Sequence, residues 1–207
     1  MVLQYLKLAG LWIGWCALHS AMISAPVLRA VEKIPWTIGR FYRLLFNVIS
    51  AVTFVAVLVF ALSIDKEWVW RWEGTGRVVP FVLFAIALVF FIGGGRHYDF
   101  KEFLGLRQID RREQSRSLAG VGRLETGGML AITRHPWYTG AIAFIWATDV
   151  SVARLISNII LTVYLIVGAH LEERKLLDEF GEEYRMYQNR VPMFLPLGFF
   201  RPAKRRR

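Results

Sequence analysis

The sequence predicts an all-α, polytopic membrane protein with about five transmembrane helices. Of its 207 residues 55% are hydrophobic and only 20% are charged, more apolar side chain than a soluble domain of this size can bury. Two long runs, residues 44–64 and 78–95, contain no charged residue. Because an apolar helix of about 20 residues crosses the hydrocarbon core of a bilayer, both runs predict membrane spans.

Three further apolar segments complete the predicted set of helices. Residues 3–24 are interrupted only by Lys7 and His19 and predict a retained first helix rather than a cleaved signal peptide. Residues 136–148 and 152–168 predict a helical hairpin, although the first arm, at ~1.5 Å per residue, is short for a full span. After Gly181, a plausible helix end, residues 182–190 predict a C-terminal helical extension.

The basic residues are distributed unevenly between the two sides that five helices define. The net charge is +10, and 21 of the 26 Lys and Arg residues fall in segments 25–43, 96–135 and 170–207. The positive-inside rule then places the N-terminus outside and the C-terminus in the cytoplasm. With such apolar runs, the expected polyanionic partner is membrane lipid and not nucleic acid.

These boundaries divide one predicted membrane domain, residues 1–207, into four parts. Residues 1–95 hold the first three helices, and residues 96–135 form a cytoplasmic connection. Residues 136–196 contain the hairpin and the part expected to bind a cofactor, and the basic tail, 197–207, is expected to bind lipid headgroups.

All four histidines fall near predicted cytoplasmic helix ends: His19, His97, His135 and His170. No two have the i, i+4 spacing of a helical metal site, and Cys16 is the only cysteine, so we expect no metal site. Each histidine alone can also be a residue at the membrane–water interface. Four histidines together can also suggest a haem site.

Residues 133–140 read TRHPWYTG and predict the start of the fourth helix, with Pro136 in its first turn. The N–H groups and positive dipole end of a helix, beside Arg134, suit an anion such as a carboxylate or phosphate. The same residues also suit a membrane-edge anchor, with Trp137 and Tyr138 in the aromatic belt.

A pair of carboxylates, Glu172 and Glu173, follows His170 where the fifth helix leaves its apolar run. Carboxylates at a membrane boundary need a cationic partner, which can be a ligand or nearby basic side chains: Arg134, Arg174 and Lys175. Glu173 lies about 100° around the helix from Glu172, so we expect it to pair weakly with surrounding basic residues instead of sharing one site.

The sequence resembles known membrane enzymes in several stretches. RHPWYTG, followed after an apolar run by EERKLLDEFGEEYRMYQNRVPMFLP, resembles the isoprenylcysteine carboxyl methyltransferase and phospholipid methyltransferase superfamily. LHSAMIS, FYRLLFNVIS and HYDFKEFLGLRQI are similar to bacterial methanethiol S-methyltransferases, and GGMLAITRHP is similar to NnrU-like proteins. The resemblance implies an integral membrane enzyme that uses S-adenosylmethionine, bound at the cytoplasmic end of the last two helices.

The resemblance also implies roles for individual residues, the cofactor contacts being His135, Pro136, Trp137, Tyr138 and Glu172. In chemical terms, Arg134 at the helix start suits the cofactor carboxylate, and Glu172 can accept from its hydroxyl or ammonium groups. Tyr138 can pack on the adenine or sulfonium. A thiol acceptor has a pKa near 8.5 and benefits from a base, for which His170 is the first candidate and His19 the second.

Two departures from the isoprenylcysteine enzymes bear on the acceptor. Gly168 stands where they carry an arginine, and Leu130 where they carry an aromatic residue. We therefore expect methyl transfer to a small thiol or a lipophilic, membrane-accessible acceptor. The alternatives are isoprenylcysteine-type carboxyl or phospholipid methylation, a haem-dependent isomerase, and a non-catalytic membrane accessory protein. The isomerase is implied by relatives of the NnrU-like proteins, and its haem ligands would be His19, His97 or Cys16. The sequence does not specify an oligomeric state.

Overall fold

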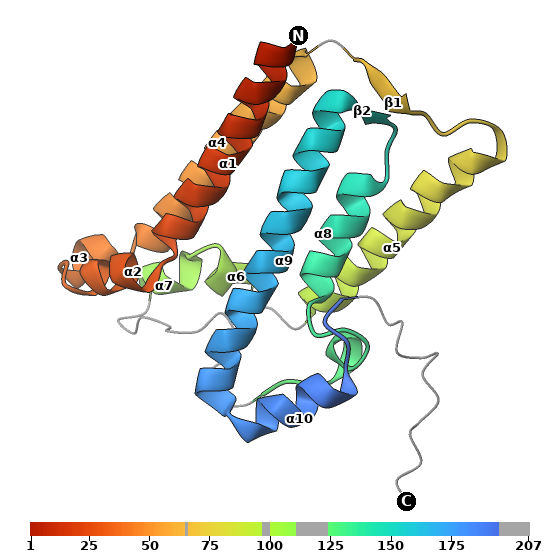
Figure 1. Cartoon of the computed structure of the whole chain (residues 1–207). Coiled ribbons are helices and arrows are strands. Elements are labelled where there is room, and N and C mark those ends of the chain that lie inside the picture. Colours follow the sequence, from red (N-terminus) through yellow and green to blue (C-terminus); the bar gives the residue numbers. More distant parts are fainter. Residues whose placement is uncertain (65, 97–99, 111–123, 195–207) are drawn as a thin grey trace, which may run out of the picture. The chain divides into compact units, whose positions relative to one another are not determined.

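A computed structural model of the chain describes residues 1–64, 66–96, 100–110 and 124–194, and these are almost entirely helical (Figure 1). The chain folds as two compact units, each assembled from segments distant in sequence. The first comprises Met1–Arg71, Tyr98–Val121 and Asp149–Tyr164, and the second comprises Trp72–His97, Gly122–Thr148 and Leu165–Arg207.

The first unit is built on α1 (Val2–Met22), which packs along α4 (Tyr42–Ser63) (Figure 1). Its core contains Leu8, Trp12 and Val57, and the indole Nε1 of Trp12 donates a 2.8 Å hydrogen bond to Ser157 Oγ. Ser157 lies in the first part of α9 (Val152–Phe180). Four short helices complete the described part of this unit: α2 (Ala25–Glu32), α3 (Trp36–Gly39), α6 (Phe100–Phe103) and α7 (Leu106–Asp110).

A two-stranded antiparallel sheet in the first unit departs from the all-α prediction. Strand β1 (Trp68–Trp70) pairs with β2 (Val150–Ser151), with Trp68 opposite Ser151 and Trp70 opposite Val150. Aromatic and β-branched residues fit an extended backbone, and the Val152 N–H donates to the Glu67 carbonyl at 2.8 Å, which ties the strands together where α9 begins.

The second unit carries the remaining long helices. A 3₁₀ turn, η1 (Gly74–Arg77), leads into α5 (Val78–Gly95), and η2 (Gly128–Ala131) precedes α8 (Pro136–Trp146). Helices α5 and α8 pack closely because glycine stands at their contact: a Cβ at Gly140 would lie 3.2 Å from the Ala87 carbonyl oxygen. The end of α9 and α10 (Glu182–Arg190) enclose a small core of Tyr184, Tyr187 and Val191.

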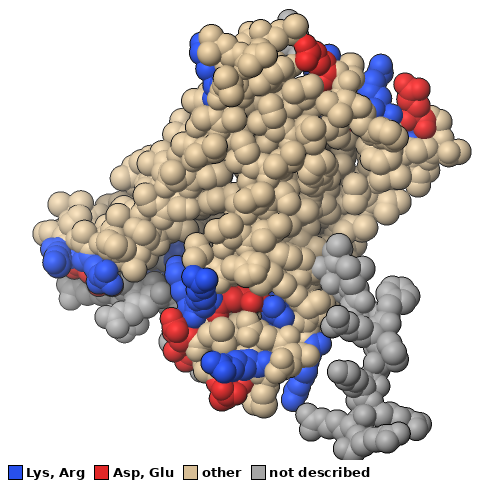
Figure 2. All heavy atoms as spheres, viewed as in Figure 1, with Lys and Arg blue, Asp and Glu red and all other residues tan. Residues whose placement is uncertain are grey.

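The described helices have the composition of membrane spans. Three are long and apolar enough to cross a bilayer (Trp36–Ser63, Gly74–Gly95 and Val152–Phe180), and a fourth counts if α1 and α2, bent by 45°, form one span. Many large apolar side chains along α4 and α5 are exposed, and Figure 2 shows charged side chains gathered near helix ends with uncharged residues between them. Exposed apolar faces of this extent suit lipid, and the chain is an integral membrane protein.

Several predicted boundaries are confirmed. The helix over residues 78–95 has the expected ends, and α9 and α10 meet at Gly181, whose φ of +54° favours glycine. Helix α9 continues past residue 168 to Phe180 because residues 169–180 include no glycine or proline. Helix α8 has only 11 residues. The count of five spans and the orientation stay predictions. The predicted tail, 197–207, and residues 97–99 and 111–123 of the predicted connection lie outside the described residues.

Candidate functional site

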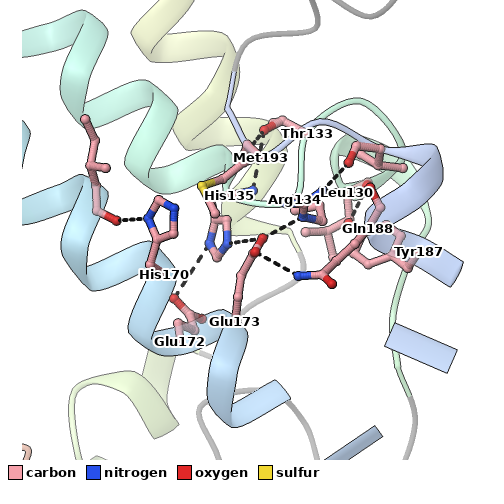
Figure 3. Close-up of polar contacts among 12 residues, drawn as sticks. Leu130, Thr133, Arg134, His135, His170, Glu172, Glu173, Tyr187, Gln188 and Met193 are labelled. Atoms are coloured by element: carbon pink, nitrogen blue, oxygen red, sulfur yellow. Dashed lines mark hydrogen bonds and ion pairs between the residues drawn. The ribbon is translucent and has the colours of Figure 1, made fainter. Parts of the chain in front are cut away.

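His135 is the centre of a polar cluster in the second unit, where it caps the N-terminus of α8 (Figure 3). Pro136 fixes the first helical position, and the imidazole, 4% exposed, projects toward α9. Its Nε2 lies 3.2 Å from Glu173 Oε1, and its Nδ1 lies 3.7 Å from Glu172 Oε2. Two consecutive carboxylates of α9 therefore flank the two nitrogens of one ring.

Glu173 is the buried member of this carboxylate pair, with a side chain 9% exposed against 31% for Glu172. Besides His135, it accepts hydrogen bonds from Arg134 Nε at 2.6 Å and from Gln188 Nε2 at 2.8 Å. The expectation that Arg134 is a cationic partner of the pair is confirmed. The expectation that Glu173 is a weakly paired residue pointing elsewhere is wrong, because the imidazole presents nitrogens on two sides and can meet carboxylates 100° apart.

Arg134 and its neighbours hold the segment that follows α10. The Arg134 Nη1 donates to the carbonyl oxygens of Gln188 and Val191. The backbone N–H groups of Arg134 and His135 donate to the carbonyls of Pro192 and Met193, at 3.0 and 3.2 Å. Arg134 was expected to bind a ligand anion, but its Nε and Nη1 atoms bond acceptors of the protein. Arg134 therefore joins Glu173 of α9 to the C-terminal end of α10.

Of the other residues in the predicted HPWY motif, two pack within the protein and one lies beside His135. Pro136 is fully buried, and the indole of Trp137 lies against α5 at Gly94 and edge-on to Phe91, with ring centroids 6.4 Å apart. Tyr138 turns to the other side: its ring is edge-on to His135 at 5.4 Å and lies near Gly168 of α9. The structure brings together His135, Tyr138 and Glu172, whereas Trp137 packs between helices.

His170, the predicted base, is exposed on α9, and its Nδ1 bonds the Ile166 carbonyl at 2.8 Å (Figure 3). Because a carbonyl only accepts, Nδ1 is the donor, and Nε2 is the acceptor of the neutral ring. His19, the second candidate, belongs to the first unit, where its Nδ1 lies 2.7 Å from the Tyr164 hydroxyl. His97 lies outside the described residues, and Cys16 is a half-buried free thiol of α1.

Two tyrosines of α10 close the buried side of the cluster. The Tyr187 hydroxyl donates to the Leu130 carbonyl at 2.6 Å, and Tyr184 is 1% exposed. Burial raises the pKa of the Tyr187 phenol to about 12 and raises the pKa of Tyr184 as well. Both stay protonated under all ordinary conditions, so they supply neutral packing beside the Arg134–Glu173 pair, and Tyr187 also supplies a donor.

Sequence reasoning missed the contributions of Gln188 and of the carbonyls at Pro192 and Met193. A buried glutamate requires several donors, and this need could have drawn attention to polar residues of the predicted extension. No sequence signal identifies backbone carbonyls as partners.

In comparisons with known proteins, one family model matches most of the chain. The model of a family described as "NnrU protein" matches residues 7–192. Among curated relatives, the chain is 40% identical over 96 residues to methanethiol S-methyltransferase 1 of Bradyrhizobium diazoefficiens, covering 46% of this chain and 33% of that protein. It is 32% identical over 146 residues to methanethiol S-methyltransferase of Pseudomonas deceptionensis, covering 62% and 53%.

A more distant relative is the protein-S-isoprenylcysteine O-methyltransferase of Schizosaccharomyces pombe, 34% identical over 80 residues, with 36% of this chain and 33% of that protein covered. The matches to these three relatives span about half of their length or less. No solved structure matches the chain significantly.

Proposed function

The chain belongs to the NnrU protein family, and on that premise we propose that it is an S-adenosylmethionine-dependent membrane methyltransferase acting on a small thiol or a lipophilic acceptor. The names of its methanethiol S-methyltransferase relatives support a thiol in particular. The observation that carries the proposal is the accessible Glu172 carboxylate beside the Nδ1 of a buried histidine.

The chemistry of these side chains fits the cofactor. S-adenosylmethionine presents donors on its ammonium and ribose hydroxyls, and Glu172 and His135 supply acceptors at one place. Tyr138, edge-on to His135, offers an aromatic face for the adenine or the cationic sulfonium. Arg134 acts by holding His135 and the segment after α10 in place. Pro136 and Trp137 contribute through the fixed start of α8.

When bound, S-adenosylmethionine supplies an electrophilic methyl group on its sulfonium, so the protein's task is to orient the reactants and exclude water. His170 is our candidate for the proton acceptor, because its Nδ1 donates to Ile166 and its Nε2 can take the proton of a thiol. In the cell, we propose an inner-membrane location with the site in the cytoplasm, supported by the uneven distribution of basic residues. Membrane lipids are then its surroundings and the route of a lipophilic acceptor.

Calorimetric titration of S-adenosylhomocysteine into the purified full chain tests this proposal. Replacing Glu172 with Gln keeps the shape but removes charge-assisted hydrogen bonds worth ~1.5–3 kcal/mol, so affinity should fall roughly ten- to a hundred-fold. Glu183→Gln is the matched control, because Glu183 is an exposed residue of α10 outside the cluster. Its affinity should equal that of the wild type.

Activity is measured by transfer of a labelled methyl group from S-adenosylmethionine to methanethiol in the same detergent. Glu172→Gln should lower the rate at limiting cofactor, and His170→Gln should slow turnover with little change in cofactor affinity. Equal affinities of folded wild type and Glu172→Gln would refute the cofactor assignment. Absence of any binding by the wild type would favour a non-catalytic accessory protein.

A further inference from the structure

The two oxygens of Glu173 accept from three donors on two different segments, the start of α8 and α10. Oε1 receives the Nε–H of Arg134 and bonds the Nε2 of His135, and Oε2 receives the side-chain amide of Gln188 (Figure 3). Arg134 is itself fixed by the carbonyls of Gln188 and Val191. A carboxylate held from three sides cannot rotate, so it presents one oxygen to His135 in a fixed direction.

This arrangement determines which nitrogen of His135 carries a proton. An ionised carboxylate can only accept, so the Nε2 of His135 must be the donor of the 3.2 Å bond. In the neutral ring, Nδ1 is then an acceptor. The carboxylate of Glu172 lies 3.7 Å from this Nδ1, too far for a hydrogen bond between them, and it is also an acceptor. Two acceptors therefore stand next to each other, one of them accessible.

We propose that Glu173 is a positioning residue that fixes the Nε2–H form and the orientation of His135, and thereby makes its Nδ1 an acceptor paired with Glu172. Such a pair binds a ligand with adjacent donors, either an ammonium group or two neighbouring hydroxyls. The ligand's identity as S-adenosylmethionine rests on the proposed function, whereas the form of the ring does not. Glu173, which points away from the accessible side, acts through His135 alone.

The form of the ring is read directly from ¹⁵N-histidine NMR spectra of the full chain in detergent, recorded at mildly alkaline pH. The chain has four histidines, and the His135 signals are assigned by their loss in His135→Asn. The wild type should show His135 protonated on Nε2. In Glu173→Gln, where one amide oxygen remains for three donors, His135 should show a mixture of both forms. Glu173→Asp restores the carboxylate and should restore most of the Nε2–H form, and Glu183→Gln should match the wild type.

Binding supplies the second readout, with S-adenosylhomocysteine and 5′-methylthioadenosine as probes. Glu173→Gln should weaken S-adenosylhomocysteine roughly three- to tenfold, with recovery in Glu173→Asp. An equal loss for 5′-methylthioadenosine, which keeps the hydroxyls but lacks the ammonium, identifies the hydroxyls as the donors. A loss confined to S-adenosylhomocysteine identifies the ammonium.

Two results would overturn the inference. One is a wild-type His135 protonated on Nδ1, either alone or together with Nε2, a result that needs no variant to fold. The other is a Glu173→Gln protein, shown to be folded by its melting curve, with an unchanged ring form. If the ring depends on Glu173 but neither probe binds the wild type, the positioning role stands and the proposed function fails.

Discussion

Replacing Gly94 by alanine should disturb the candidate site by displacing the first turn of α8, which Gly94 contacts. A Cβ at Gly94 would lie 2.5 Å from Cδ1 and 2.8 Å from Nε1 of Trp137, and 3.1 Å from Cγ of Pro136. Non-bonded carbon atoms prefer about 3.5–4.0 Å, so the indole and the first turn of α8 must move by about 1 Å. Insertion of a methyl group into a packed contact costs about 1–3 kcal/mol.

The shift should be felt at His135, which directly precedes Pro136. For a chain of this size, 1–3 kcal/mol corresponds to a fall in melting temperature of about 3–10 °C. We also expect weaker binding of S-adenosylhomocysteine, because a displaced His135 misaligns the acceptor pair. Melting curves in detergent and calorimetric titration measure the two effects.

Gly127→Ala is the control, because a Cβ at Gly127 would have no atom within 4 Å and its φ of −88° suits any residue. Trp137→Leu in the Gly94→Ala background should recover part of the lost stability by making room for the methyl group. If Gly94→Ala melts and binds like Gly127→Ala, the packing between α5 and α8 does not position the site as argued.

Two further predictions concern the α10 tyrosines and the membrane orientation. Burial raises the pKa of Tyr187 from 10 to about 12, so its contribution to stability is complete below about pH 10 and is lost as the pH rises toward 12. Because this loss exceeds the ~1 kcal/mol of one hydrogen bond, melting temperatures of wild type and Tyr187→Phe should converge and then cross in this range. Below pH 10, Tyr187→Phe should be less stable by about 1 kcal/mol through loss of the Leu130 hydrogen bond. The charge distribution predicts a cytoplasmic C-terminus. A reporter that functions only in the cytoplasm should therefore be active when it is fused after Arg207, and activity of a reporter that functions only in the periplasm would contradict the predicted topology.

The helices were predictable because their signals are local. An uncharged run sets α5 at residues 78–95, and Gly181 marks the break before α10. The small sheet was not predictable, since its strands are three and two residues long and are joined only by a non-local pairing. The continuation of α9 beyond its apolar run to Gly181 was also predictable, because a helix that leaves the bilayer ends only where its backbone requires it.

At the site, the resemblance placed His135 and Glu172 together at the end of the last two helices, and the two side chains do approach each other, whereas the expectation for Glu173 was wrong. Helical geometry separates the two glutamates by about 100°. This angle prevents them from sharing a partner only if the partner offers a single contact atom. His135 is a ring with nitrogens on two sides, so both carboxylates reach it. Arg134 was an ambiguous residue, because a guanidinium at a helix start suits an external anion and an internal carboxylate equally well. Its hydrogen bonds to Gln188 and Val191 favour a structural role within the protein. Sequence reasoning could not foresee these bonds, because both partners lie more than 50 residues away in sequence.

The buried Glu173 also explains why the start of α8, the end of α9 and the segment after α10 belong to one cooperative structure. A carboxylate with a side chain only 9% exposed is strongly unfavourable unless its oxygens are paired, and its three donors come from residues 134, 135 and 188. If α10 and the segment after it detached, Gln188 would leave Glu173, and the Pro192 and Met193 carbonyls would leave the backbone of Arg134 and His135. Each loss makes the next contact less favourable, so the acceptor pair at His135 and Glu172 is complete only when all three segments are in place. A site held in this way keeps its geometry before any ligand arrives, as the orientation of a methyl donor requires.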